Sequence, residues 1–141
     1  MSPKGPFTLI TVNTAPERAA RLIGRMVEAL KDSYTIIHVR NCETIDQIPP
    51  AVEQIQPDLL FVASMWTKEE SLAIIEIAER ERPGVVTHAI PHGLQVDRGP
   101  DAVVEHLVGM VPKLLEGIGE REGIEGRGER MGEGKGDKEV A

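Results

Sequence analysis

The sequence is poor in the residue types on which several kinds of binding site depend. Only 3% of its residues are aromatic, and it has a single cysteine, Cys42. The scarcity of aromatic residues argues against a stacking platform for single-stranded nucleic acid. One cysteine allows neither an internal disulfide nor a cysteine-based metal cluster. The core must therefore be built mainly of aliphatic side chains.

Basic residues and long apolar runs are also lacking. The 141 residues include 16 Lys and Arg against 23 Asp and Glu, which gives a formal net charge of −7. This charge disfavours binding to phosphate backbones and to anionic membranes. No apolar run approaches the roughly 20 residues that span a bilayer, and the first residues lack the hydrophobic core of a signal peptide. We therefore expect a soluble, cytoplasmic protein that binds neither nucleic acid nor membranes.

The sequence also has no glycine-rich phosphate loop. After the first predicted strand, residues 7–12, the chain continues Asn-Thr-Ala-Pro-Glu, which fits neither G-x-G-x-x-G nor a Walker motif. Ser64 does not lie in the G-x-S-x-G motif of the α/β-hydrolases. Classical dinucleotide binding, P-loop nucleotide binding and that kind of hydrolase are therefore disfavoured. The cofactor, if there is one, is unknown from the sequence.

Strand and helix patterns alternate along most of the chain. Apolar, β-branched runs predict strands at residues 7–12, 34–39, 59–63 and 85–90. Apolar residues at spacings of three and four predict amphipathic helices between these strands and after the last one. Such alternation indicates a three-layer α/β domain with a four-stranded parallel sheet. The simplest strand order is 2-1-3-4, as in flavodoxin-like and other Rossmann-like folds.

Two of the predicted helices begin with the same sequence signature. Thr14 with Glu17, and Thr67 with Glu70, have the spacing of a capping box. We therefore expect each threonine side chain to cap the helix that follows it.

The end of the predicted domain is less regular. We expect a short edge strand at Leu94–Val96, which could serve as the interface of a homo-oligomer, and a last helix that Pro112 kinks or shortens. Residues 117–141 contain eight glycines and twelve charged residues without hydrophobic periodicity. Because such a segment buries too little apolar area to offset its ordering entropy, we predict one domain over residues 1–116 and a disordered tail over 117–141.

The candidate binding site follows from the predicted strand order. Ligands of open α/β sheets bind beyond the carboxyl ends of the strands, where the strand order reverses, here between the first and third strands. The loops after these strands hold the candidate residues for binding a small molecule or a protein partner: Asn13, Thr14, Ser64, Met65, Trp66 and Thr67. Trp66, the only tryptophan, could floor a ligand pocket, cover the sheet edge or anchor a partner.

Histidine and cysteine side chains offer two further hypotheses. His88 and His92 could ligate a metal together with a carboxylate such as Glu17. Alternatively, His88 packs near a strand end and His92 is an ordinary loop residue. Cys42 could be a nucleophile if a helix N-terminus lowered its pKa, or it could be a buried structural residue.

The linear pattern looks most like that of the hydrogenase-maturation endopeptidases, over most of the predicted domain. Asn13 lies where the Gly-x-Gly-Asn turn of that family ends, and residues 41–65 are similar to its run from the second strand through the metal-bearing strand. The resemblance implies nickel binding through a Glu, an Asp and a His. Glu17 lies near the first of these positions, Ser64 replaces the Asp, and His88 would stand in for the His. Small class II chelatases share the helix and strand rhythm but carry a His-Gly-Ser turn that this chain lacks.

The sequence thus leads to two functional hypotheses from different classes. We expect a binding or regulatory module with its site at the strand ends, because no coherent set of acid, base, nucleophile or phosphate loop is present. The alternative is a metal-dependent enzyme or metal-handling protein that resembles the two families above with degenerate motifs.

Overall fold

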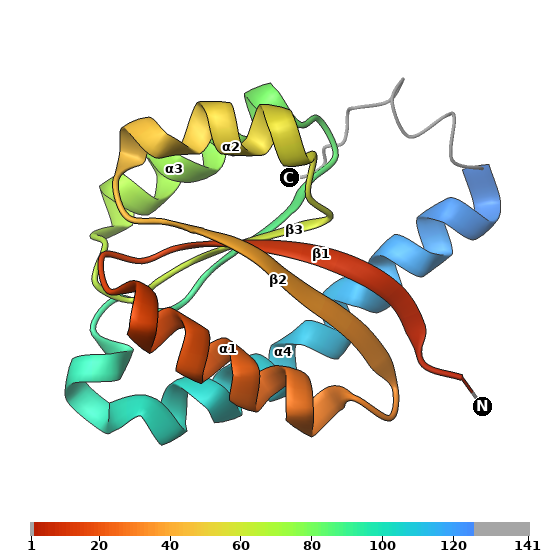
Figure 1. Ribbon diagram of the computed structural model, residues 1–141, viewed down its shortest axis with the longest axis horizontal. Coiled ribbons are helices and arrows are strands. Elements are labelled where there is room, and N and C mark those ends of the chain that lie inside the picture. Colours follow the sequence, from red (N-terminus) through yellow and green to blue (C-terminus); the bar gives the residue numbers. More distant parts are fainter. Residues whose placement is uncertain (1, 126–141) are drawn as a thin grey trace.

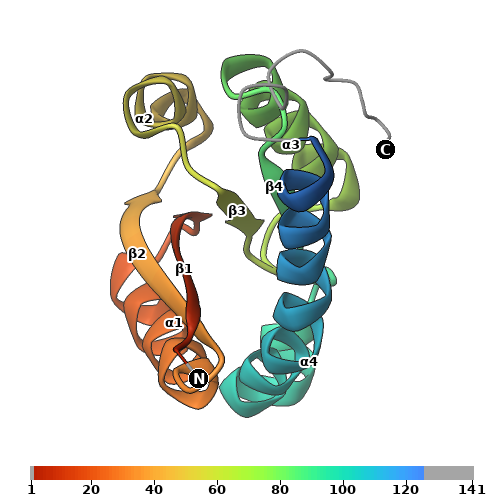
Figure 2. The ribbon, with the colours of Figure 1, turned by 90° about the vertical axis from the view of Figure 1, so that its right-hand side faces the viewer.

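The computed structural model describes residues 2–125, which form a parallel β-sheet between two layers of helices (Figures 1 and 2). Within these residues the sheet has four strands in the order β2-β1-β3-β4. The strands are β1 (Lys4–Val12), β2 (Tyr34–Cys42), β3 (Leu59–Val62) and β4 (Val86–Ala89). All neighbours run parallel, so the predicted α/β class, parallel sheet and flavodoxin-like strand order are confirmed.

The helices cover both faces of the sheet. One layer consists of α1 (Pro16–Leu30) and α4 (Leu94–Glu125), and the other of α2 (Ile48–Ile55), preceded by the 3-10 helix η1 (Ile45–Gln47), and α3 (Lys68–Glu81) (Figure 1). Leu9 and Phe61 pack in the core beneath α1 and α4, whereas their chain neighbours Ile10 and Leu60 pack in the core beneath α2 and α3. The central strands are apolar on both faces because both faces are covered.

One of the two predicted helix caps is present. The Thr67 side chain accepts a hydrogen bond from the Glu70 N–H (3.1 Å), and the Glu70 carboxylate accepts one from the Thr67 N–H (2.9 Å). This reciprocal pair satisfies two N–H groups that would otherwise lack partners at the start of α3.

The other predicted capping box is wrong. The N-cap residue of α1 is Ala15, and no side chain forms a capping hydrogen bond at this helix end. Thr14 and Glu17 therefore do not form the expected capping box. Instead, the Asn13 Oδ1 accepts a hydrogen bond from the Ala15 N–H (2.7 Å). An asparagine side chain readily bonds the backbone two residues ahead, and here this local turn takes the place of the threonine cap.

The two threonines therefore form a matched pair for a stability test. Thr67→Ala should lower the free energy of unfolding by about 1 kcal/mol, because it removes a helix cap. Thr14→Ala should lower it by less than about 0.5 kcal/mol, as for an exposed residue without a cap. Urea unfolding of both variants measures the difference, and equal losses would contradict the assignment of the caps.

The segment after β4 is helical from its first residues. The predicted edge strand at Leu94–Val96 is wrong, because these residues form the first turn of α4, where the Asp97 N–H donates to the Gly93 carbonyl (2.8 Å). The backbone of α4 is non-helical at Gly99, with φ 87° and ψ 175°, a conformation that glycine adopts at little cost. The homo-oligomer interface expected at this position required an edge strand, and residues 94–96 are helical instead.

Beyond this break α4 continues further than expected. The expected interruption at Pro112 is not seen, and the helix runs to Glu125, past the predicted domain end at residue 116. Leu115 and Ile118 are 2% and 3% exposed in the core beneath α1 and α4, so burial of apolar side chains extends into the predicted tail. Residues 126–141 of that predicted tail lie outside the described residues. No helix among the described residues is long and apolar enough to cross a membrane.

Candidate functional site

The loops that follow β1 and β3 lie side by side at the carboxyl edge of the sheet. Val12 and Val62 are paired in register, and the Ala63 N–H donates to the Val12 carbonyl (3.1 Å). Asn13 and Ser64 follow these positions, and both are buried, with 5% and 6% exposure. The strand order reverses between β1 and β3, so these buried polar residues lie where the fold usually places a ligand.

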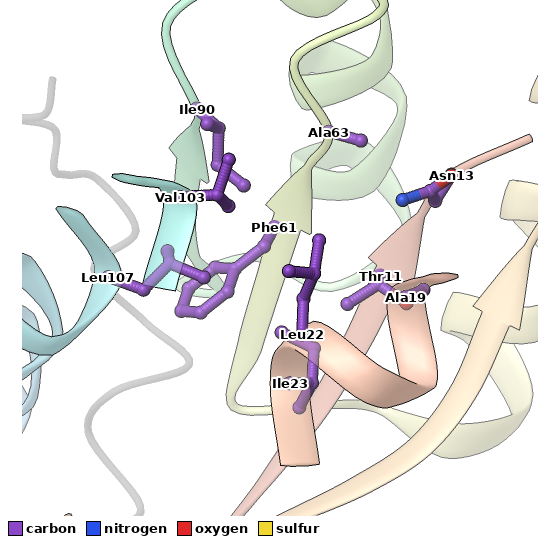
Figure 3. A pocket seen from close by; sticks show the side chains of 10 residues that line it. All are labelled: Thr11, Asn13, Ala19, Leu22, Ile23, Phe61, Ala63, Ile90, Val103 and Leu107. Atoms are coloured by element: carbon purple, nitrogen blue, oxygen red, sulfur yellow. The ribbon is translucent and has the colours of Figure 1, made fainter. Parts of the chain in front are cut away.

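Asn13 is held by its backbone and its side-chain oxygen, but not by its side-chain nitrogen. Its N–H donates to the Cys42 carbonyl (2.9 Å), its carbonyl accepts from Asn41 Nδ2 (2.9 Å), and its Oδ1 accepts from the Ala15 N–H (2.7 Å). Among the described residues, the Nδ2 group has no hydrogen-bond partner. The bond to Ala15 fixes the orientation of the amide, and Figure 3 shows the nitrogen on the side of the hollow described below.

A part-buried hydrogen-bond network supports Asn13 from the neighbouring strands. The Thr11 hydroxyl donates to Asn41 Oδ1 (2.7 Å) and lies 2.8 Å from His38 Nε2. Since a hydroxyl has one proton, Thr11 must accept from His38, and the Nε2 of His38 therefore carries a proton. Burial lowers the pKa of His38, which favours its neutral form. The network links β2 to the Asn13 loop.

Ser64 ties the start of α4 to the end of β3. Its carbonyl accepts from the Gly93 N–H (2.9 Å), and its Oγ accepts from the Gln95 N–H (3.2 Å). Within the described part of the chain, the side-chain oxygen of Gln95, Oε1, is buried and has no hydrogen-bond partner. A second polar group without a partner therefore lies close to Ser64.

A two-part cavity opens between the sheet end and the helices α1 and α4. The inner hollow, about 290 Å³, is lined by Thr11, Asn13, Ala19, Leu22, Ile23, Phe61, Ala63, Ile90, Val103 and Leu107 (Figure 3). The outer hollow, about 250 Å³, is lined by Asn13, Arg18, Leu22, Ala63, Ser64, Met65, Ile90, Gln95 and Val103. Both volumes include space open to solvent, and the five shared residues join the two hollows. Both hollows are mainly apolar, and the outer one adds the polar side chains of Arg18, Ser64 and Gln95 to that of Asn13.

Arg18 supplies the one charge in the wall of these hollows. It lies in the first turn of α1, is half-buried, and lines the outer hollow. Its guanidinium group forms no hydrogen bond or ion pair with any described residue, whereas Arg25 on the same helix pairs with Asp101 (2.9 Å). A half-buried guanidinium without a counter-charge favours an anion as its partner.

The structure places three of the six predicted binding residues at the cavity and the other three outside its lining. Asn13, Ser64 and Met65 line the outer hollow. The Thr14 hydroxyl lies 3.6 Å from the Met65 sulfur, outside the lining, and Thr67 is occupied as the cap of α3.

Trp66 lies on the opposite face of the sheet from the cavity. Its indole N–H donates to the Val12 carbonyl (3.0 Å), and its ring packs against the core beneath α2 and α3. Of the three roles considered for Trp66, covering the sheet edge fits this position, whereas flooring this cavity does not.

The predicted metal ligands are not brought together. Among the described residues there is no group of three or more His, Cys, Asp or Glu side chains that could hold a metal ion. His92 Nδ1 donates to the Trp66 carbonyl (2.8 Å) at the surface, and Glu17 is exposed at the start of α1. His88 instead lies on β4 against α4, where its Nε2 is 2.8 Å from His106 Nε2.

The His88 and His106 rings are stacked, with centroids 5.0 Å apart and planes 24° apart. Their hydrogen bond requires one Nε2 to donate and the other to accept, so at least one ring is neutral. Burial, together with the charge that His106 would carry, lowers the pKa of His88 from about 6.5 to about 4. Burial also lowers the pKa of His106.

This pair predicts an acid-sensitive contribution to stability. Below about pH 6.5 these histidines take up protons in the unfolded chain but remain neutral to lower pH in the folded chain. The free energy of unfolding therefore falls as the pH drops from about 6.5 towards 4. Because His88 is only half-buried, we expect a loss of about 1–2 kcal/mol rather than the full value of the shift. Urea unfolding of the His88→Phe variant across this range should show a smaller loss. An identical pH profile in the variant would contradict the role of the pair.

Cys42 fits the structural interpretation rather than that of a nucleophile. It is fully buried at the end of β2, with its Sγ 3.7 Å from the Gln47 carbonyl. Burial raises the pKa of the thiol, and the nearby Arg40 only partly opposes this effect. A reactive cysteine needs the reverse, a lowered pKa and access to solvent.

The sequence analysis missed two polar residues of the cavity, Arg18 and Gln95. Each belongs to the first turns of a helix that flanks the strand ends. Arg18 was not among the candidate residues, and Gln95 fell in the predicted edge strand. Helix α1 begins directly beside the reversal of strand order, and this was the available signal that its first turn faces the site.

The sequence matches no protein-family model, and no curated protein is significantly similar to it. The interpretation of the site therefore depends on its geometry.

Proposed function

We propose that this protein is a small-molecule binding or regulatory module, with its site in the cavity beyond the carboxyl ends of β1 and β3. The observation that carries the proposal is the Asn13 side chain. It is 95% buried, its nitrogen lines the cavity, and that nitrogen has no hydrogen-bond partner among the described residues.

Two side-chain polar groups without partners among the described residues, Asn13 Nδ2 and Gln95 Oε1, support a ligand at this position. Among the described residues, Gln95 Oε1 in the wall of the outer hollow is buried without a hydrogen-bond partner. Leaving a buried polar group unpaired costs about 1–3 kcal/mol, and natural proteins retain few such groups. Asn13 is kept in place by three other hydrogen bonds, so its unpartnered nitrogen stays directed at the open space of the cavity (Figure 3). An acceptor atom of a bound ligand would satisfy it.

The composition of the cavity wall favours binding over catalysis. Its polar side chains are Thr11, Asn13, Arg18, Ser64 and Gln95, and they include no histidine, carboxylate, cysteine or lysine. General acid–base catalysis needs a group with a pKa near the working pH within reach of the ligand. The rival interpretation, a metal-dependent enzyme, gains no support, because its proposed ligands Glu17, His88 and His92 lie apart.

A cavity-filling substitution tests this proposal. Ala63 lines both hollows and is 9% exposed, so Ala63→Val should narrow the passage between them. Ala89→Val, on the neighbouring strand β4 and against the opposite core, is the matched control. The untagged full chain would be incubated with the dialysable fraction of a cell extract and analysed by native mass spectrometry.

We expect a bound small molecule on the wild-type chain and on Ala89→Val, and its loss from Ala63→Val while that variant remains folded by circular dichroism. Equal retention by folded Ala63→Val, or no bound molecule on any chain, would overturn the proposed site.

A further inference from the structure

We propose that the ligand of this cavity is a small carboxylate with a short aliphatic chain and a hydroxyl or ammonium group next to the carboxylate. This inference builds on the proposed function and assigns its ligand class. The carboxylate would lie in the outer hollow against Arg18, Asn13 and Ser64, and the aliphatic chain would enter the inner hollow.

The outer hollow provides hydrogen-bond donors and one positive charge. The Arg18 guanidinium has five N–H donors in a planar arrangement that matches a carboxylate, and no described residue occupies them. Asn13 Nδ2 adds a donor from the floor of the same hollow. The Ser64 Oγ already accepts from the Gln95 N–H, which leaves its hydroxyl proton free to be donated. No carboxylate lines either hollow to compete for these groups.

An unpartnered acceptor in the wall of the outer hollow, Gln95 Oε1, indicates what the second polar group of the ligand is. Gln95 Oε1 is buried without a partner, so it needs a donor, which a simple carboxylate lacks. A hydroxyl or ammonium group on the carbon beside the carboxylate would supply that donor while the carboxylate contacts Arg18 and Asn13.

The lining of the inner hollow indicates the chemistry of the ligand's aliphatic part. Eight of its ten lining residues are apolar, and Phe61 and Leu107 line it on the side away from Asn13 (Figure 3). Transfer of each methylene group from water into such surroundings contributes about 0.8 kcal/mol. The narrow space suits a branched chain of a few carbons.

The start of α1 argues against a phosphate as the anion. Phosphate sites at helix N-termini use several free backbone N–H groups. Here Pro16 lacks an N–H group and the Ala15 N–H is already bonded to Asn13 Oδ1. Only the Glu17 and Arg18 N–H groups are therefore left at this helix end. The anion is therefore recognised by side chains and in particular by the planar guanidinium of Arg18, which favours a planar carboxylate.

Four probes distinguish the features of this ligand. They are α-hydroxyisovalerate, isovalerate, which lacks the hydroxyl, α-hydroxyisovaleramide, which lacks the charge, and inorganic phosphate. Each would be titrated into the full chain and followed by amide NMR. We expect α-hydroxyisovalerate to shift the signals of Asn13, Arg18, Ser64 and Gln95. We expect the uncharged amide to bind about 10- to 100-fold more weakly, because it loses a charge-assisted hydrogen bond, and isovalerate to bind about tenfold more weakly.

Three variants assign the roles of the side chains. Arg18→Gln should weaken binding of α-hydroxyisovalerate about 10- to 100-fold, whereas Arg21→Gln, one turn further along α1 and exposed, should leave it unchanged. Asn13→Asp keeps an oxygen acceptor for the Ala15 N–H but turns the donor into a negative charge, so it should abolish binding of the carboxylate.

The outcomes separate this inference from the proposed function. Binding of the uncharged amide or of phosphate as tightly as the hydroxy acid, or an undiminished affinity in Arg18→Gln, would overturn the ligand class. The same holds if none of the four probes shifts the cavity signals. In each case a small molecule that Ala63→Val loses in the mass-spectrometry experiment would still uphold the site itself.

Discussion

Replacement of Phe61 by alanine should lower the free energy of unfolding by about 3–5 kcal/mol. Phe61 is 1% exposed on the central strand β3, and it packs among the side chains of α1 and α4. It also closes the inner hollow (Figure 3), so its removal joins a new void to an existing one. The loss combines the transfer free energy of the ring with the cost of the enlarged cavity.

Urea unfolding measures this loss, and Leu72→Ala is the matched control. Leu72 lies on α3 and is 59% exposed, so its truncation should change stability by no more than about 0.5 kcal/mol. A loss below about 1.5 kcal/mol for Phe61→Ala would mean that the neighbours collapse onto the void. That result would contradict the rigid, helix-covered cavity on which the proposed site depends.

Thr11→Val should lower stability by about 2–4 kcal/mol although valine has nearly the same shape as threonine. The Thr11 hydroxyl links His38 Nε2 to Asn41 Oδ1 in the network beneath Asn13. Its removal leaves a donor and an acceptor without partners in a part-buried place, and each such group costs about 1–3 kcal/mol.

Thr35→Val controls for the change of side chain, because Thr35 is exposed on β2 and should tolerate valine within about 0.5 kcal/mol. NMR of the imidazole nitrogens adds a direct check, since the network requires a proton on His38 Nε2. A stable Thr11→Val variant, or a His38 protonated on Nδ1 alone, would contradict the network.

Much of the fold could be predicted from the sequence because its signals are local and agree with one another. The apolar strand Leu59–Val62 and the Thr67 cap after it contain the information that places them. The Thr14 cap was wrong because Asn13 Oδ1 forms a local turn with the Ala15 N–H, and the helix starts after Ala15 rather than directly after Thr14. The short pattern Leu-Gln-Val at residues 94–96 fits a strand or a helix equally well, and contacts with Ser64 select the helix.

The site was only partly predictable for a similar reason. The rule for strand ends located Asn13, Ser64 and Met65, since it depends only on strand order. The roles of Arg18 and Gln95 depend on how α1 and α4 cover the sheet, which no local pattern encodes. The metal hypothesis used the spacing of His88 and His92 along the chain, but Pro91 and the turn after it direct the two rings to different neighbours.

The side-chain amide signals of Asn13 test the central claim most directly. They would be recorded by NMR on the full chain, before and after addition of the small molecule that native mass spectrometry identifies. If the cavity is the binding site, both Nδ2 protons should be observed and at least one should shift as the nitrogen gains an acceptor. Unchanged Asn13 signals with a saturating, bound ligand would show that the molecule binds elsewhere and would contradict the proposed site.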